Sequence, residues 1–387
     1  MPVRIERRTF VVASSAAAAQ AFLSSSQSRA AALPVEILET KVISQDGRFY
    51  NGWPTVYRRA NGQLVVTCSG GREGHVCPFG RVEMMTSDDE GKSWSYPRVL
   101  LDGPIDDRDS GILETVKGTL LVTTFTSLAY EPLLAKANQD GKWDQEKLAR
   151  WNAVNSRLSA DTRQKELGVW IIRSTDGGLT WSPKHDSLVN SPHGPIQLAD
   201  GRLLYAGKDL WRAGSRVGVC ESTDDGQTWR WLAEIEPRDG DHPDEYHELH
   251  AVDCGDGRVV VHIRNHNPAN KGETLQCESA DGGKTWNKPK SIGVWGLPSH
   301  LLKLRDGRLV MTYGHRRATL GNQARISTDQ GRTWSEPILI SGDGSSGDLG
   351  YPSTMELGDG TLLTVWYDAM RGSPNAVLRQ TKWRFAG

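Results

Sequence analysis

The sequence predicts an all-β protein, a six-bladed β-propeller, and two sets of internal repeats lead to that prediction. The pattern Ser-x-Asp-x-Gly-x-x-Trp occurs five times, at residues 87–94, 174–181, 222–229, 279–286 and 327–334. An apolar run, a turn ending in Gly and a second apolar run recur six times, around Gly62, Gly118, Gly201, Gly257, Gly307 and Gly360. Repeats spaced by roughly 50 residues are typical of propellers, whose blades have four strands each. Six glycine turns therefore predict six blades.

The boxed pattern predicts a β-hairpin turn within a blade. In such a turn the Asp hydrogen-bonds to the backbone, the Gly adopts a positive φ, and the Trp packs back over the turn. The last blade contains Gly360 but no box. We therefore expect residues 35–50 to supply its outer strand and close the ring, which would remove both sheet edges.

The second blade carries an insertion. Gly118 and Gly201 are 83 residues apart, whereas the other neighbouring glycine turns are 50 to 56 residues apart. Within residues 128–167, Leu148, Trp151 and Val154 have near-helical spacing. We predict a short helical hairpin there, which is either a lid or wall beside the site or a surface decoration.

The first 32 residues predict a bacterial twin-arginine export signal. Arg7 and Arg8 precede a mild apolar stretch and a run of small residues that ends at Ala32. The propeller would then comprise residues 33–387 of a periplasmic or secreted protein; a disordered Ala/Ser tail is the alternative. Five Cys residues leave at least one unpaired, and Cys68 and Cys77 could form a disulfide.

Charge and hydropathy exclude several classes of partner. The net charge of −1 gives no general attraction to nucleic acid or to an anionic membrane. No apolar run reaches about 18 residues, so no membrane span is expected after the leader. We expect a monomer.

Polar residues recur at a fixed offset from the glycine turns. Each turn joins the two inner strands of a blade, so residues nine before it and seven to ten after it lie at the opposite end of the ring. Counting backward gives Trp53, Asp109, Pro192, Glu248, Pro298 and Tyr351, with Asp107, Arg108, His193, His247, His250 and His300 as neighbours. Counting forward gives Arg72, Glu73, Arg264, Arg316, Arg317 and Asp368, among others. We expect these side chains to meet at one mouth and form a ligand site.

The boxes, the six blades and the polar mouth resemble the sialidase (neuraminidase) superfamily, whose repeats are called Asp boxes. The resemblance covers nearly all of the mature chain, and it implies a glycan substrate without a cofactor. Glu248, sixteen residues before Arg264, resembles the segment in which a Glu activates the nucleophile and an Arg binds the substrate carboxylate. The segment Tyr351-Pro352-Ser353 resembles the one carrying the nucleophilic Tyr. By position, Arg316 or Arg317 is similar to a further substrate-binding arginine, and Asp368 to an acid that braces an arginine.

A tyrosine and a glutamate form a useful catalytic pair. A free Tyr has a pKa near ~10 and is a poor nucleophile until a neighbouring carboxylate takes its proton. A neutral phenol can also approach an anomeric carbon that bears a carboxylate, whereas an anionic Asp or Glu would be repelled.

Two segments depart from the family's pattern. Residues 51–54, Asn-Gly-Trp-Pro, lack the first arginine, so Trp53 could stack against a sugar instead, and Arg72 or Arg108 could replace the missing charge. The loop of residues 70–77 lacks the family's acid/base Asp. The proton donor to the leaving group could instead be Glu73, His75, Asp107 or Asp109.

Several histidines project to the mouth. We expect His193, His247, His250 and His300 to bind sugar hydroxyls, while His75 could act as an acid or base. We expect no metal, because the spacing matches no ligand motif and His247 and His250 would point to opposite faces of a strand.

The sequence thus predicts a sialidase-like exo-glycosidase that hydrolyses a terminal acidic sugar, sialic acid or a related one, from glycans. Two alternatives remain open: a lyase or hydrolase for a uronic-acid polysaccharide, and a carbohydrate-binding propeller without turnover.

Overall fold

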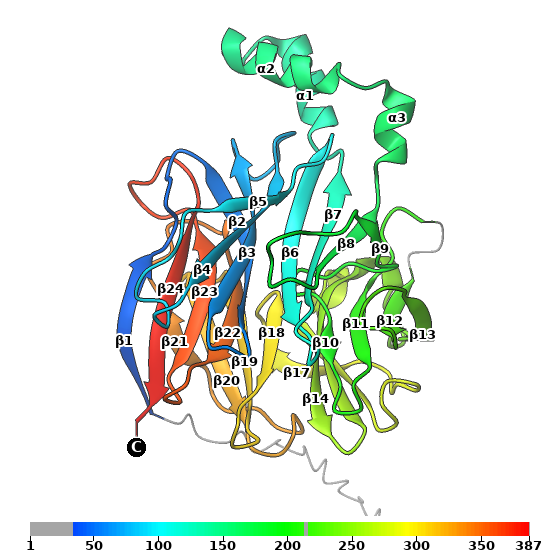
Figure 1. The fold of residues 1–387 in the computed structure, drawn as a ribbon, viewed down its shortest axis with the longest axis vertical. Helices are drawn as coiled ribbons and strands as arrows, with labels where there is room; N and C mark the ends of the chain where they lie inside the picture. Colours follow the sequence, from blue (N-terminus) through cyan, green and yellow to red (C-terminus); the bar gives the residue numbers. More distant parts are fainter. Residues whose placement is uncertain (1–33, 213–215, 387) are drawn as a thin grey trace, which may run out of the picture.

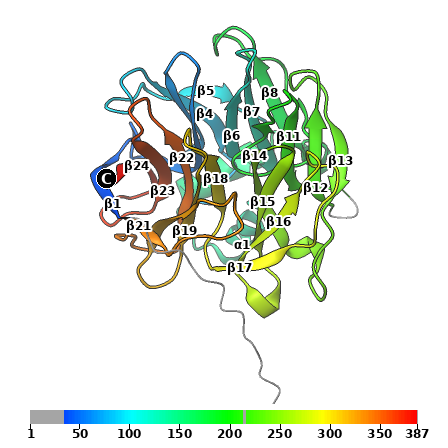
Figure 2. The ribbon, with the colours of Figure 1, turned by 90° about the horizontal axis from the view of Figure 1, so that it is seen from below.

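The computed structural model describes residues 34–212 and 216–386, so the predicted export signal lies outside the described residues. It contains six four-stranded antiparallel sheets arranged as blades around an axis (Figures 1 and 2), which confirms the predicted fold class. Blade 1 comprises β2 (Tyr50–Arg58), β3 (Leu64–Arg72), β4 (Arg81–Ser87) and β5 (Arg98–Leu101). Blade 2 comprises β6 (Asp106–Glu114), β7 (Leu120–Ser127), β8 (Val169–Ser174) and β9 (His185–Asp186). Blade 3 comprises β10 (Ile196–Gln197), β11 (Leu203–Lys208), β12 (Val217–Ser222) and β13 (Arg230–Glu234).

The remaining blades follow the same order along the chain. Blade 4 comprises β14 (Tyr246–Gly255), β15 (Arg258–Asn265), β16 (Thr274–Ser279) and β17 (Lys290–Val294). Blade 5 comprises β18 (Ser299–Lys303), β19 (Leu309–His315), β20 (Gly321–Ser327) and β21 (Ile338–Ser341). Blade 6 comprises β22 (Leu349–Glu356), β23 (Leu362–Asp368), β24 (Val377–Phe385) and, as its outer strand, β1 (Val35–Val42). Two 3-10 turns, η1 (Pro243–Glu245) and η2 (Pro268–Asn270), flank β14 and β15.

The N-terminal strand closes the ring, as predicted. β1 pairs antiparallel with β24 from Val35 opposite Phe385 to Val42 opposite Arg379. One sheet therefore contains both the first and the last described strands, which ties the two ends of the propeller together.

The Asp boxes close their turns and also join neighbouring blades. In the first box, the Ser87 hydroxyl donates to Asp89 (2.7 Å) and accepts from the Gly91 N–H (2.8 Å). Gly91 has a φ of +79°, and a Cβ there would lie 2.7 Å from Leu363 of blade 6. The Trp94 indole donates to Gln380, also in blade 6, at 2.8 Å. The box is thus an inter-blade contact as well as a turn.

The apolar core lies between neighbouring sheets. Leu64 and Val66 of β3, for example, belong to one buried cluster with Leu363 and Val365 of β23. The five cysteines are free and buried in this packing, so the possible disulfide between Cys68 and Cys77 is not formed. Within the described ranges, no helix is long and apolar enough to cross a membrane.

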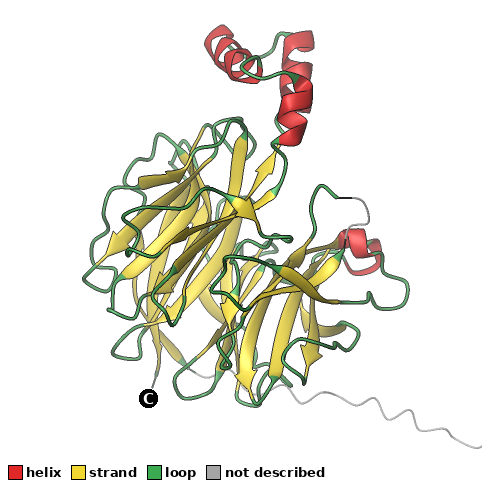
Figure 3. Ribbon diagram, turned by 45° about the vertical axis from the view of Figure 1, so that its right-hand side comes forward, coloured by secondary structure: helices red, strands yellow, loops and turns green. Residues whose placement is uncertain are grey.

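The insertion of blade 2 is helical. Between β7 and β8 the chain forms α1 (Glu131–Asp140), α2 (Gln145–Asn155) and α3 (Ala160–Lys165). The N-cap side chains Asp144 and Ser159 accept from backbone N–H groups in the first turns of α2 and α3. The helices project from one end of the propeller (Figures 1 and 3). Trp151 of α2 packs in one cluster with Cys77 from the loop after β3, so the insertion borders the end where β3 finishes.

Candidate active site

Four residues occupy equivalent bulges in the first strands of their blades. Trp53, Asp109, Glu248 and Tyr351 have φ values of +54°, +55°, +44° and +51°. The pairing with the second strand shifts register at each of them. A bulge re-aims a side chain, and a positive φ costs a non-glycine residue roughly 1–3 kcal/mol. Such repeated strain makes this rim of the ring a candidate functional site.

Tyr351, Glu248 and Arg264 form a hydrogen-bonded triad. The Tyr351 hydroxyl donates a short hydrogen bond to Glu248, and Arg264 Nη1 lies 3.0 Å from the Tyr351 oxygen. Arg264 also pairs with the second carboxylate oxygen of Glu248. A hydrogen bond thus joins side chains from blades 4 and 6 that are 103 residues apart in the sequence.

The charges of the triad are set by burial and by each other. Burial opposes ionisation of Glu248, but Arg264 and the Tyr351 hydrogen bond outweigh it and lower the pKa of Glu248. Burial, and then the Glu248 charge, raise the pKa of Tyr351 well above its usual value. The arrangement is therefore a neutral phenol held against an ionised carboxylate, with the carboxylate ready to accept the phenol proton.

Asp109 is a buried carboxyl beside this triad. Burial, and then the charge of Glu248, raise its pKa to about 7. Asp109 and Glu248 line the same cavity of about 160 Å³, whose walls include Phe125 and Trp211. A carboxyl that titrates near pH 7 can donate a proton and take it back under neutral conditions. Asp107, by contrast, accepts from the Gly103 N–H at 2.6 Å and does not line this cavity.

Four arginines lie around the pair of rings formed by Trp53 and Tyr351. Besides Arg264, the Arg316 guanidinium lies 5.8 Å from the centre of the Tyr351 ring, anchored on the Leu349 carbonyl. Arg108 lies 4.6 Å from the centre of the Trp53 ring. The two rings are 6.3 Å apart, edge to face. Arg72 also lies over the Trp53 ring, 5.0 Å from its centre.

Other predicted arginine and acid positions have different partners. Arg72 is fully buried and its guanidinium is bound to Asp106 at 2.6 and 3.0 Å. Arg317 lies over Trp295. Asp368 accepts from Arg379 at 3.0 Å. These contacts keep the three side chains engaged with the protein rather than with the triad.

Trp53 also packs against a histidine and carboxylate pair. The ring centres of Trp53 and His75 are 5.0 Å apart, and His75 Nδ1 lies 2.9 Å from Asp348. Tyr50 and Tyr367 both donate to the same carboxylate. Asp348 was not among the residues selected from the sequence, although it lies only three positions before Tyr351 on the same rim.

Glu73 is held by the helical insertion. Its carboxylate accepts from Arg150 (3.0 Å) and from the Trp151 indole (2.8 Å), both on α2. α2 therefore fixes the loop that carries His75, which places the insertion beside the site as a wall.

The histidines divide into two groups. His247 lines the Asp109 cavity, and burial together with Lys208 lowers its pKa to about 4. His193, His250 and His300 instead line a separate pocket on the ring axis. Among the described residues, Glu245, His247 and His266 form the one group with metal-ligand spacing. Arg264 donates to His266 at 2.7 Å, and the charges of Lys208 and Arg264 disfavour a cation there.

Comparison with known proteins assigns this architecture to a family. A model of the BNR repeat-like domain matches residues 141–364, more than half of the chain. The chain belongs to the BNR repeat-like domain family. This BNR-repeat propeller is 25% identical to a sialidase of Clostridium perfringens over 269 residues, 67% of the chain and 54% of that protein. It is also 25% identical to a sialidase of Micromonospora viridifaciens over 242 residues, 53% of the chain and 35% of that protein. The propeller thus spans about half, or less, of these relatives' length.

Solved structures share the fold. A protein of unknown function from Dyadobacter fermentans superposes with a TM-score of 0.72 at 23% identity, over 91% of this chain and 99% of that one. Hadza microbial sialidase Hz136 superposes with a TM-score of 0.61 at 16% identity, over 86% of this chain and 65% of that one. The K499G mutant of NanB sialidase from Streptococcus pneumoniae superposes with a TM-score of 0.61 at 15% identity, over 90% of this chain and 70% of that one. At these identities the likeness establishes the fold alone, a six-bladed β-propeller.

Proposed function

We propose that this propeller is a sialidase-like exo-glycosidase that releases a terminal acidic sugar, sialic acid or a related one, from a glycan. The observation that carries the proposal is the Tyr351 hydroxyl, which donates to Glu248 and lies 3.0 Å from Arg264 in a strained bulge at the mouth. A Tyr nucleophile activated by a carboxylate is the sialidase exception among glycosidases. The relatives named sialidase support the same reaction class.

In the first step Tyr351 attacks the anomeric carbon and passes its proton to Glu248. The bond from that carbon to the leaving oxygen breaks, and Asp109 donates its proton to that oxygen. In the second step Asp109 takes a proton from water, the water oxygen attacks the anomeric carbon, and the bond to Tyr351 breaks while Glu248 returns the proton. Two displacements retain the configuration at the anomeric carbon.

The positive charge around the nucleophile supports an acidic sugar. Arg264 and Arg316 flank Tyr351, and Arg108 lies over Trp53. Guanidinium groups bind carboxylates through paired charge-assisted hydrogen bonds. We assign the substrate carboxylate to Arg264 and Arg316, with Arg108 on its third side. We place the reaction outside the cytoplasm, as the twin-arginine pattern of residues 1–32 suggests.

The test is hydrolysis of fluorogenic sialosides and of related acidic glycosides by the mature protein. We expect release of the fluorophore by the wild type and not by Glu248→Gln, with both proteins folded. Products with ultraviolet absorbance from a uronic-acid polysaccharide would instead favour a lyase. Binding of acidic glycans without any turnover would favour a lectin-like propeller, and either result would overturn the proposal.

A further inference from the structure

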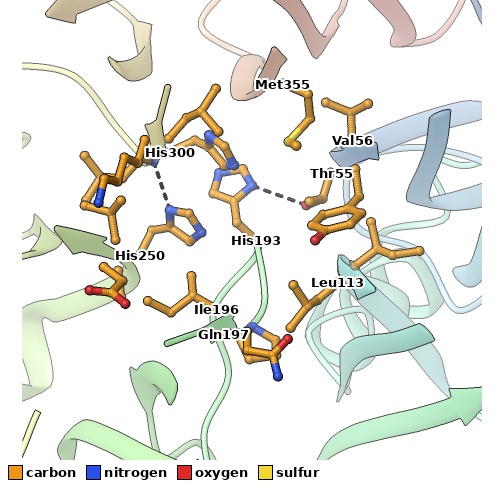
Figure 4. A pocket seen from close by; sticks show the side chains of 18 residues that line it. Thr55, Val56, Leu113, His193, Ile196, Gln197, His250, His300 and Met355 are labelled. Carbon is orange, nitrogen blue, oxygen red and sulfur yellow. Dashed lines mark hydrogen bonds between the residues drawn. The ribbon is translucent and has the colours of Figure 1, made fainter. Parts of the chain in front are cut away.

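The ring axis holds a second pocket, of about 320 Å³, lined by the first strands of all six blades (Figure 4). Its size lies in the range of small-molecule sites, roughly 300–1,000 Å³. It shares no lining residue with the Asp109 cavity. The residues that line it lie farther along the strands than the bulges, as far as Asp253 and the exposed Lys303 near the glycine turns. The pocket therefore opens on the face opposite to the mouth.

Three histidines form the closed end of this pocket. His193, His250 and His300 come from blades 3, 4 and 5 and are 2%, 4% and 6% exposed. Their ring centres lie 4.6 to 5.4 Å apart, and Figure 4 shows them grouped at one side of the pocket. Val56, Ile112 and Met355 contribute to its apolar walls.

Hydrogen bonds with the protein fix the tautomer of two rings. His250 Nδ1 accepts from the Leu301 N–H at 2.9 Å, and His300 Nδ1 accepts from the Thr354 N–H at 3.4 Å. A neutral imidazole whose Nδ1 accepts carries its hydrogen on Nε2. Both rings thus present an Nε2–H donor on the edge turned away from the backbone.

The third ring has the opposite tautomer. The Thr55 hydroxyl donates its hydrogen to the Pro192 carbonyl at 3.1 Å, so it accepts from His193 Nδ1, 3.2 Å away. His193 Nε2 therefore carries no hydrogen and can only accept a hydrogen bond. It is buried and has no hydrogen-bond partner among the described residues. A buried acceptor of this kind costs free energy until a donor reaches it.

We propose that the axial pocket binds a small neutral hydroxylated molecule, a polyol or a neutral monosaccharide, with its hydroxyl groups on His193, His250 and His300. A hydroxyl both accepts and donates, so it complements two N–H donors and one acceptor. Apolar walls suit the C–H faces of such a molecule. A metal ion would meet two N–H groups, and a carboxylate would face the lone pair of His193.

Histidine side-chain NMR of the full chain, labelled with 15N, tests the proposal. We expect Nε2–H tautomers for His250 and His300 and the Nδ1–H tautomer for His193. Titration with glycerol, D-glucose, D-galactose, D-mannose and L-rhamnose is expected to shift these three rings with at least one compound, while exposed His242 stays unchanged. Sodium acetate and Zn²⁺ serve as the anionic and metallic probes.

Three variants test where the molecule binds. Ala251→Met fills the pocket from its wall and is expected to weaken binding at least 10-fold; half-buried Met355→Phe is the second choice if that variant misfolds. Tyr351→Phe is expected to bind as the wild type does, which separates this site from the proposed glycosidase. Shifts caused by Zn²⁺ or acetate alone, or no shift with any of the five hydroxyl compounds, would overturn the proposal.

Discussion

Tyr351 shows how one residue's chemistry depends on its neighbours. Its hydroxyl is a weak nucleophile, and burial makes it weaker by raising the pKa. In the proposed reaction the Glu248 carboxylate compensates because it accepts the proton during attack, and Arg264 keeps that carboxylate ionised. The strained backbone of the bulge holds both groups in position before substrate arrives.

Replacement of Tyr351 by Phe removes only the hydroxyl. We expect kcat/KM on a fluorogenic sialoside to fall at least ~1,000-fold, because the covalent step is lost. Tyr96→Phe, at an exposed Tyr, is the matched control and should retain full activity. Retention of more than a tenth of the activity by Tyr351→Phe would exclude Tyr351 as the nucleophile.

Asp109 gives the activity a pH dependence. Its raised pKa of about 7 means that the proton needed by the leaving group is lost as the pH rises through about 7. We expect kcat of the wild type to fall above about pH 7, and we expect Asp109→Asn to abolish this fall. The substitution should lower kcat most for substrates with poor leaving groups. Asp107→Asn is a close control, since Asp107 is equally buried and has a pKa of about 7. An unchanged pH profile in Asp109→Asn would exclude Asp109 as the acid.

The same shift affects stability. A carboxyl whose pKa is raised in the folded state contributes its stability below the unfolded value, near ~4, and that contribution is lost as the pH rises through about 7. Asp109→Asn should therefore be more stable than the wild type at pH 8, by up to about 4 kcal/mol, with little difference at pH 4. Urea unfolding at the two pH values measures this; equal stability at pH 8 would contradict the burial argument.

At the scale of the element, the Asp box links two blades through its Trp. The fully buried Gln380 receives the Trp94 indole N–H at 2.8 Å. Trp94→Phe leaves that amide oxygen without a donor, which we expect to cost about 1–3 kcal/mol in urea unfolding. Trp286→Phe is the control, because its indole bonds within its own box, to the Gly283 carbonyl. Equal losses in the two variants would mean that the inter-blade bond adds nothing.

The elements also show where sequence patterns reach their limit. The offset of nine residues from each glycine turn located Trp53, Asp109, Glu248 and Tyr351 at one rim, because the first strands of these four blades have similar lengths, 8 to 10 residues. It could not predict their positive φ, since none is Gly or Asn. It also assigned His193, His250 and His300 to the mouth, whereas a shift of one or two positions past the bulge places them in the axial pocket.

For the whole molecule, closure of the ring depends on one strand. β1 pairs with the edge of β24 from Arg379 to Phe385. A truncation that starts after residue 43 should expose that edge, and we expect loss of cooperative unfolding and concentration-dependent aggregation in light scattering. A truncation that starts at residue 34 is the control and should behave as the longer chain does. A stable monomer without β1 would show that closure is dispensable.

The sequence by itself determined the repeat: five boxes and six glycine turns require a closed ring of blades, because local turn chemistry and strand alternation are encoded within each repeat. It also determined that Tyr351, Glu248 and Arg264 lie at one end of the blades. Only the tertiary structure decided that the Tyr351 hydroxyl donates to Glu248, that Arg72 is bound to Asp106 while both Arg72 and Arg108 lie over Trp53, and that Asp348 contacts His75. Those outcomes depend on side-chain distances between blades, which no pattern along the chain specifies.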